Sequence, residues 1–160
     1  MIRITFAFCF LFISCSKEKD YSRPSLSYLA LGDSYTIGES IEIEDSYPNQ
    51  LKEKIDLIDS LKIIAKTGWT TDELIDTLNN SNLKQYDIVS LLIGVNNQFR
   101  GYDIDNYKVE FENLLTKTIK YSNSKKNVFV LSIPDYGVTP FGESRGKEKI
   151  YDEINAYNDI

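Results

Sequence analysis

The sequence predicts an α/β fold, in which a parallel sheet is covered by helices on both faces. The first reason is order: short apolar runs of strand length alternate with amphipathic helical patterns four times between Leu26 and Tyr157. The second reason is the run Asp87–Ile93, which is so continuously apolar that both faces of this strand must be buried.

The strands are expected where apolar residues cluster and a Gly, Asp or Asn follows. Their predicted ranges are Leu26–Leu31, Leu61–Ala65, Asp87–Ile93 and Val128–Ile133. Right-handed crossovers between parallel strands place all of their carboxyl ends at one edge of the sheet. The loops that follow the strands are therefore expected to converge there.

The helices are predicted from apolar spacing and from signals at their ends. Ser46 with Pro48 marks one start, and Leu51, Ile55 and Ile58 recur at helical spacing after it. Thr70 and Glu73 form a capping box at the start of the next helix. A long helix follows over Ile104–Tyr121, and the last is marked by the apolar residues Ile150, Ile154 and Tyr157.

Composition and charge narrow the classes of partner. The 160 residues fit one domain, and 42% hydrophobic with 26% charged residues is typical of a globular protein. The net charge of −6 argues against binding to nucleic acid, whose phosphates require a basic surface. No internal repeat is visible.

The N-terminus predicts export. Arg3 precedes the apolar run Ile4–Ile13, which is too short to span a bilayer and is typical of a signal peptide. Ser14-Cys15 resembles a bacterial lipobox, in which the cysteine becomes lipidated. We therefore expect a signal segment (1–15), a polar tether (16–25) and one domain (26–160), held at the bacterial cell envelope by lipid on Cys15. The alternatives are ordinary secretion with cleavage near Ser14 and a cytosolic chain.

Small and polar residues follow each predicted strand. They are Gly32-Asp33-Ser34, Gly68, Gly94-Val95-Asn96 and Asp135-Tyr136-Gly137. Ligands of open α/β sheets bind at this edge. Acyl transfer needs a nucleophile and donors aimed at the developing oxyanion, and Ser34 could supply the first. Its own N–H, the Gly68 N–H and the Asn96 amide could supply the donors. Serine is also a common helix cap, so Ser34 alone would not indicate catalysis.

In this order the motifs resemble the first three sequence blocks of the GDSL/SGNH hydrolases. The resemblance implies a flavodoxin-like three-layer α/β/α sandwich with sheet order 2-1-3-4-5, and hydrolysis of small-molecule, glycan or lipid esters without a cofactor or metal. It implies that Ser34 is the nucleophile and that Gly68 and Asn96 complete the oxyanion hole. Asn97 stands where the family usually has an aspartate.

One of the family's sequence blocks has no counterpart among the 160 residues. The family's base and its orienting acid lie in an Asp-x-x-His block, and the sequence contains no histidine. We expect a truncated chain whose fifth strand and Asp-x-x-His block follow Ile160, and negligible ester hydrolysis by the 160 residues. A Ser–Lys arrangement with Lys66 is disfavoured, because a lysine at a strand end is usually solvated. A non-catalytic carbohydrate- or lipid-binding module is the alternative function.

Other residues near the expected site have both a functional and a structural interpretation. The residues expected to contact substrate are Asp33, Trp69, Asn97 and Tyr136, with Tyr35 and Ile37 as further rim positions. Asp33 could instead order the loop through hydrogen bonds, and Trp69 could pack on the following helix. A flavin or nucleotide binder is disfavoured, since Gly32–Gly38 has no phosphate-binding glycine pattern. The sequence does not indicate an oligomeric state.

Overall fold

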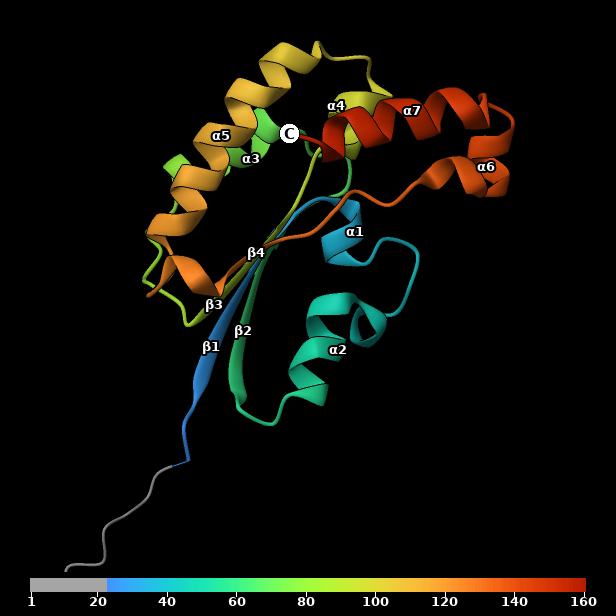
Figure 1. The fold of residues 1–160 in the computed structure, drawn as a ribbon. Helices are drawn as coiled ribbons and strands as arrows, with labels where there is room; N and C mark the ends of the chain where they lie inside the picture. Colours follow the sequence, from blue (N-terminus) through green and yellow to red (C-terminus); the bar gives the residue numbers. More distant parts are fainter. Residues whose placement is uncertain (1–22) are drawn as a thin grey trace, which may run out of the picture.

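The computed structural model describes residues 23–160. They fold around a four-stranded parallel sheet (Figure 1). The strands are β1 (Leu26–Gly32), β2 (Ile58–Ala65), β3 (Ile88–Leu92) and β4 (Val128–Val130), in the order β2-β1-β3-β4. This confirms the predicted α/β class and the strand order 2-1-3-4. The expected signal peptide, Cys15 and residues 16–22 of the tether lie outside the described residues.

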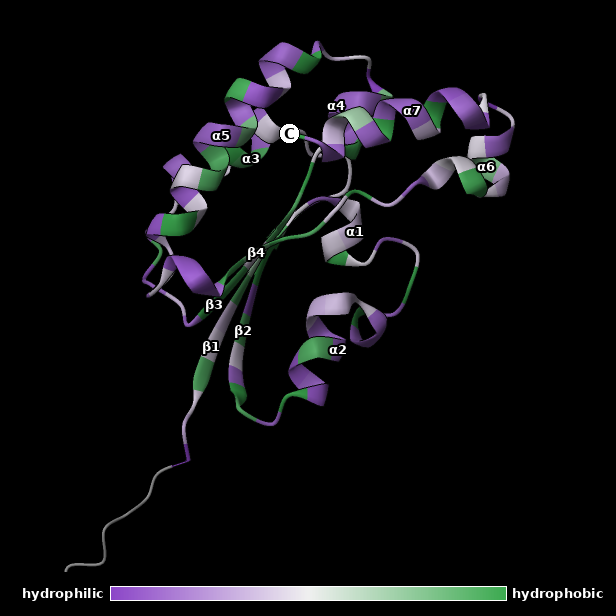
Figure 2. Ribbon diagram, in the orientation of Figure 1, coloured by the Kyte–Doolittle hydropathy of each residue, from purple (hydrophilic) through white to green (hydrophobic). Residues whose placement is uncertain are grey.

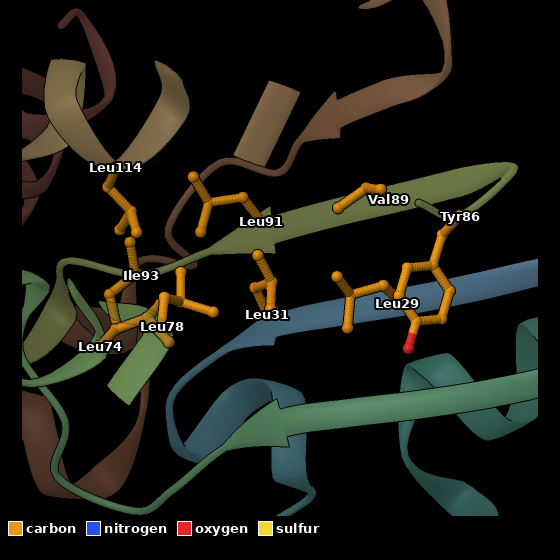
Figure 3. Close-up of a cluster of buried hydrophobic side chains, with 9 residues drawn as sticks. All are labelled: Leu29, Leu31, Leu74, Leu78, Tyr86, Val89, Leu91, Ile93 and Leu114. Atoms are coloured by element: carbon orange, nitrogen blue, oxygen red, sulfur yellow. The ribbon is translucent and has the colours of Figure 1, made fainter. Parts of the chain in front are cut away.

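One face of the sheet packs against α3 (Thr71–Asn79) and α5 (Ile104–Lys120). Alternate side chains of a strand point to the same face, so Leu29 and Leu31 of β1 lie beside Val89 and Leu91 of β3 (Figure 3). Side chains of the two helices complete this core. They are Leu74 and Leu78 of α3 and Leu114 of α5, all essentially without solvent exposure.

The opposite face packs against the short helix α2 (Tyr47–Lys54). Tyr28 and Ala30, which alternate with Leu29 and Leu31, are fully buried there. The two central strands therefore have buried side chains on both faces and are apolar along most of their length (Figure 2). This is the pattern that predicted a parallel sheet.

The remaining helices gather beyond the carboxyl ends of the strands (Figure 1). They are α1 (Ser34–Ile37), α4 (Val95–Phe99), α6 (Pro140–Glu143) and α7 (Lys147–Asn158), with 3-10 turns at Ile43–Asp45, Lys125–Asn127 and Tyr136–Val138. Ile150, Ile154 and Tyr157 of α7 are buried together with Tyr107 and Tyr136. In residues 23–160 no helix has both the length and the apolar character needed to cross a membrane.

The helix predicted after Ser46 is shorter than expected, and β2 is longer. Helix α2 begins at Tyr47, but the Ser46 hydroxyl donates to the Ile43 carbonyl oxygen (2.7 Å) and does not cap the helix. The helix ends at Lys54, and Ile58 is the first residue of β2 because it pairs with Leu26 of β1. The prediction that Ile58 lies on the helix is therefore wrong.

Strand β4 ends at Val130, although the apolar run predicts a strand to Ile133. Leu131 still donates its N–H to the Leu91 carbonyl oxygen (2.9 Å). Beyond it, the N–H of Ile133 donates to Asn158 Oδ1 (2.8 Å), and the Ile133 carbonyl oxygen accepts from Asn158 Nδ2 (3.0 Å). The side chain of Asn158, on α7, therefore forms hydrogen bonds with both backbone groups of Ile133, which would otherwise continue the sheet.

Candidate active site

The turn from β1 to α1 presents Ser34. Gly32 ends the strand where the backbone passes close to its neighbours: a Cβ there would lie 2.1 Å from Thr36 Oγ1 and 2.2 Å from the Leu92 carbonyl oxygen. Asp33 then caps the helix, because its carboxylate accepts the Tyr35 N–H (3.1 Å). Ser34 is the first residue of α1 and is half-buried.

The loops after β2 and β3 meet through Asn96. Asn96 lies in the first turn of α4, and its Nδ2 donates to the Trp69 carbonyl oxygen (2.9 Å), one residue beyond Gly68. Ser34 and Asn96 line the same cavity, of about 250 Å³. Within residues 23–160, neither the Ser34 N–H nor the Gly68 N–H donates to another protein group. The predicted oxyanion donors therefore belong to adjoining loops, and neither backbone donor has a partner in the described part of the chain.

The Gly68 turn is fixed from outside the site. Gly68 has φ of +85°, a conformation that glycine adopts without strain. Arg100 donates to the Gly68 carbonyl oxygen (2.6 Å) and lies 3.6 Å from Glu73. Glu73 also accepts the Thr70 N–H (3.0 Å), which confirms the predicted capping box at the start of α3. The carbonyl of Gly68 is thus held on the side of Arg100.

Two of the predicted substrate contacts have structural partners. Asn97 is fully buried; its Nδ2 donates to Thr71 Oγ1 (2.7 Å) and its Oδ1 accepts the Thr71 N–H (3.1 Å). Asn97 therefore joins α4 to the start of α3. Trp69 is half-buried and packs against the core beneath α3, and it is not among the residues that line the Ser34 cavity.

Asp33 is also fully buried, so it does not face the cavity as a substrate contact would. Besides the Tyr35 N–H, the backbone N–H groups of Asp33 itself and of Gly94, which precedes α4, favour the charged form of its carboxyl. Among the described residues, Asp33 Oδ2 has no hydrogen-bond partner. Burial raises the pKa of the Asp33 carboxyl to about 7, although these N–H groups act in the opposite direction. The carboxyl of Asp33 therefore caps the turn that carries Ser34.

Tyr136 does line the cavity. It lies in the turn after β4, and its hydroxyl donates to Gln98 Oε1 (2.9 Å). Gln98 in turn donates to Glu153 of α7 (2.6 Å). Tyr136 therefore presents its ring to the cavity while its hydroxyl is bonded to α4. Lys66 is exposed, as the solvated interpretation predicts.

Other cavity residues were not singled out by the sequence. Besides Ser34, Asn96, Tyr136 and the rim position Tyr35, the cavity is lined by Val95, Phe99 and Phe141. Phe99 lies one helical turn after Asn96, so its spacing could have indicated it. Phe141 follows from no local pattern, because α6 reaches the cavity only through the tertiary fold.

A larger cavity lies away from these residues. It has a volume of about 550 Å³ and is mostly apolar. Its lining includes Tyr28, Leu51 and Phe129, so it lies between α2 and the sheet. Neither Ser34 nor Asn96 contacts it, so it is separate from the candidate active site. In residues 23–160 no group of three or more His, Cys, Asp or Glu side chains is placed to hold a metal ion.

A serine at the end of the first strand of a parallel α/β sheet, with an asparagine amide beside it, is the layout of a serine-dependent hydrolase. The sequence comparison agrees with this class. The model of the GDSL-like lipase/acylhydrolase family matches residues 30–160, and the chain belongs to this family. No curated protein sequence matches the chain.

Solved structures share the fold at low sequence identity. A phospholipase A1 from Streptomyces albidoflavus superimposes with a TM-score of 0.62 and 18% identity, over 84% of this chain and 73% of that one. A lipolytic G-D-S-L family protein from Veillonella parvula gives 0.59 and 13%, over 83% and 72%. The SGNH-hydrolase esterase AlinE4 gives 0.56 and 19%, over 84% and 73%. The chain therefore has the SGNH hydrolase fold.

Proposed function

We propose that the protein is a serine ester hydrolase in which Ser34 attacks the acyl carbonyl. One observation carries the proposal. Ser34 and Asn96 line one cavity while Asn96 is bonded to the backbone beside Gly68, and this supports a single site for the proposed nucleophile and the expected oxyanion donors. The proposed substrates are small-molecule, glycan or lipid esters.

The proposed reaction has two steps. Ser34 Oγ bonds to the carbonyl carbon and gives its proton to a base, while the carbonyl oxygen becomes an oxyanion held by the N–H groups of Ser34 and Gly68 and by the Asn96 amide. The tetrahedral intermediate collapses, and the alcohol leaves with a proton from the protonated base. Water, deprotonated by the same base, then attacks the acyl-serine. The bond between the carbonyl carbon and Ser34 Oγ breaks, Oγ takes the proton back from the base, and the carboxylic acid is released.

The histidine base of the family's pattern is not among the 160 residues. We propose that it belongs to an Asp-x-x-His block encoded after Ile160, as the family pattern implies. Without it, only the residual catalysis of an oxyanion hole and substrate binding remains, on the order of a thousand-fold over water. Reading the coding sequence past Ile160 tests this directly. A stop codon with no such block would favour the alternative, a non-catalytic carbohydrate- or lipid-binding module.

Added imidazole can test the 160-residue chain itself. We expect p-nitrophenyl acetate hydrolysis to be negligible with the chain alone and to rise with imidazole concentration above the rate that imidazole gives by itself. Ser34→Ala should remove this excess. Replacing an exposed serine on β2, Ser60→Ala, is the matched control and should leave it unchanged. An excess that survives Ser34→Ala would contradict the proposal.

A further inference from the structure

Aromatic rings surround Ser34. Of the residues that line its cavity, Tyr35, Phe99, Tyr136 and Phe141 are aromatic, and they come from α1, α4, the turn after β4, and α6. Phe99 and Phe141 remain 44% and 53% exposed. Single exposed apolar side chains are ordinary, but adjoining rings that open onto a cavity indicate a binding site. We call these four residues with their cavity the ring pocket.

The rings pack on one another in defined geometry. The centres of Phe99 and Phe141 are 6.0 Å apart, with 29° between their planes. Tyr136 lies 6.1 Å from Phe141 and 6.4 Å from Phe99, the latter edge to face. These separations fall within the range of favourable aromatic pairs. The wall of the ring pocket is therefore a packed aromatic surface although parts of it are exposed.

Arg145 stabilises this wall from another side. Its guanidinium lies 4.9 Å from the centre of the Phe99 ring and 4.5 Å from that of Phe141, which are distances of cation–π contacts. Arg145 lines a neighbouring cavity and is not among the residues that line the ring pocket. It therefore holds the two rings together without occupying the space next to Ser34.

The size of the ring pocket limits what it can hold. Its volume of about 250 Å³ is below the range of roughly 300–1,000 Å³ that encloses a drug-sized ligand. A single aromatic ring is a compact group and fits within this volume. The Tyr136 hydroxyl is already bonded to Gln98, so this residue offers a ring face or edge to the guest.

We propose that the ring pocket binds a single aromatic ring carried by the ester substrate, next to Ser34. The inference rests on the proposed ester hydrolysis, because it places this ring beside the carbonyl that Ser34 attacks. The ring belongs to the acyl group or to the alcohol, and its chemistry is the same in both cases. A flat ring gains from stacking or edge contacts that a saturated group of similar size does not make.

Binding of fragments tests the inference without any catalytic base. Benzoate is compared with cyclohexanecarboxylate, and benzyl alcohol with cyclohexylmethanol, by titration of the 160-residue chain followed by NMR. An aromatic pair contributes about 0.5–1.5 kcal/mol beyond buried area, so the aromatic member should bind about two- to tenfold more tightly. Preference within the carboxylate pair assigns the ring to the acyl side, and within the alcohol pair to the alcohol side. No preference in either pair would overturn the inference.

Two phenylalanine variants locate the binding. Phe141→Leu keeps an apolar side chain but removes a ring, and should abolish the aromatic preference. Phe129→Leu is the matched control, because Phe129 is also 53% exposed but lines the larger cavity beside α2. It should leave the preference unchanged. If Phe141→Leu does not fold, Phe99→Leu replaces it.

The same phenylalanine variants can also contradict the inference. A preference that persists without the Phe141 or Phe99 ring, or that is lost in Phe129→Leu, would overturn the inference. Imidazole-dependent hydrolysis of vinyl acetate, an activated ester without an aromatic ring, followed through the release of acetaldehyde, would still test Ser34 separately. Failure of the ring pocket and failure of the proposed function are thus distinguishable.

Discussion

At the scale of single residues, the candidate site depends on Asn96. Its side chain lies between two loops: one amide hydrogen is donated to the Trp69 carbonyl oxygen, and the residue lines the cavity that holds Ser34. An amide carries a second donor, which is the one that we assign to the oxyanion. The sequence predicted Asn96 from its place after a strand and from the family resemblance. The sequence could not show that Asn96 also anchors the Gly68 turn, because these residues are far apart in the chain.

Asn96→Ala should lower the imidazole-dependent hydrolysis of p-nitrophenyl acetate by on the order of a hundred- to a thousand-fold, the usual loss when one oxyanion donor is removed. Asn97→Ala provides the contrast, since Asn97 bonds Thr71 in the interior and should chiefly lower the free energy of unfolding. Rates are compared with the unfolding midpoints of both variants. Equal loss of rate in the two variants, in proportion to lost stability, would contradict the assigned donor role.

The buried carboxyl of Asp33 should make the free energy of unfolding depend on pH. Burial raises the pKa of its carboxyl in the folded chain to about 7, well above its ordinary value of 3.8. Between these values the folded chain binds more protons than the unfolded chain, so this group's stabilising contribution is complete below pH 4 and is lost as the pH rises towards and through 7. The shift corresponds to about 4 kcal/mol at most.

Asp33→Asn removes this titration. Urea unfolding of both proteins between pH 4 and pH 8 should show the free energy of unfolding of the wild type falling relative to that of the variant as the pH rises. Curves that stay parallel over this range would show that the carboxyl is already ionised in the folded chain near pH 4.

At the scale of elements, the centre of the sheet is predictable and its end is not. The continuous apolar runs predicted β1 and β3, and their side chains are buried on both faces. The early end of β4 depends on Asn158, which lies 25 residues later and takes both backbone groups of Ile133. Likewise Phe141 reaches the cavity through the tertiary fold. Long-range contacts of this kind leave no local pattern in the sequence.

Gly32 controls how β1 joins α1. A Cβ at this position would overlap Thr36 Oγ1 and the Leu92 backbone oxygen, so Gly32→Ala should destabilise the protein by more than about 2 kcal/mol. The control is Gly101→Ala, where no heavy atom lies within 4 Å and only the positive φ of 69° opposes the change. Alanine in this left-handed conformation should cost about 1 kcal/mol. Thermal or urea unfolding distinguishes the two, and equal losses would contradict the close approach at Gly32.

At the scale of the whole molecule, the proposed site lies at one end of a domain that we expect to be tethered to a membrane. Lipid on Cys15 predicts that the protein, expressed in a bacterium, incorporates labelled fatty acid and sediments with membranes. Cys15→Ser should abolish the label and release the protein from the membrane fraction. Unchanged labelling in Cys15→Ser, or a wild type without label, would contradict the predicted anchor.

Ser34 is the proposed nucleophile, and the residue that becomes acylated can be identified directly. The 160-residue chain is treated with p-nitrophenyl acetate and imidazole, quenched in acid, digested and mapped by mass spectrometry. We expect the acetyl group on Ser34, at a level that depends on imidazole and falls strongly in Asn96→Ala. Acetylation confined to lysines and other serines, with Ser34 unmodified, would contradict the claim.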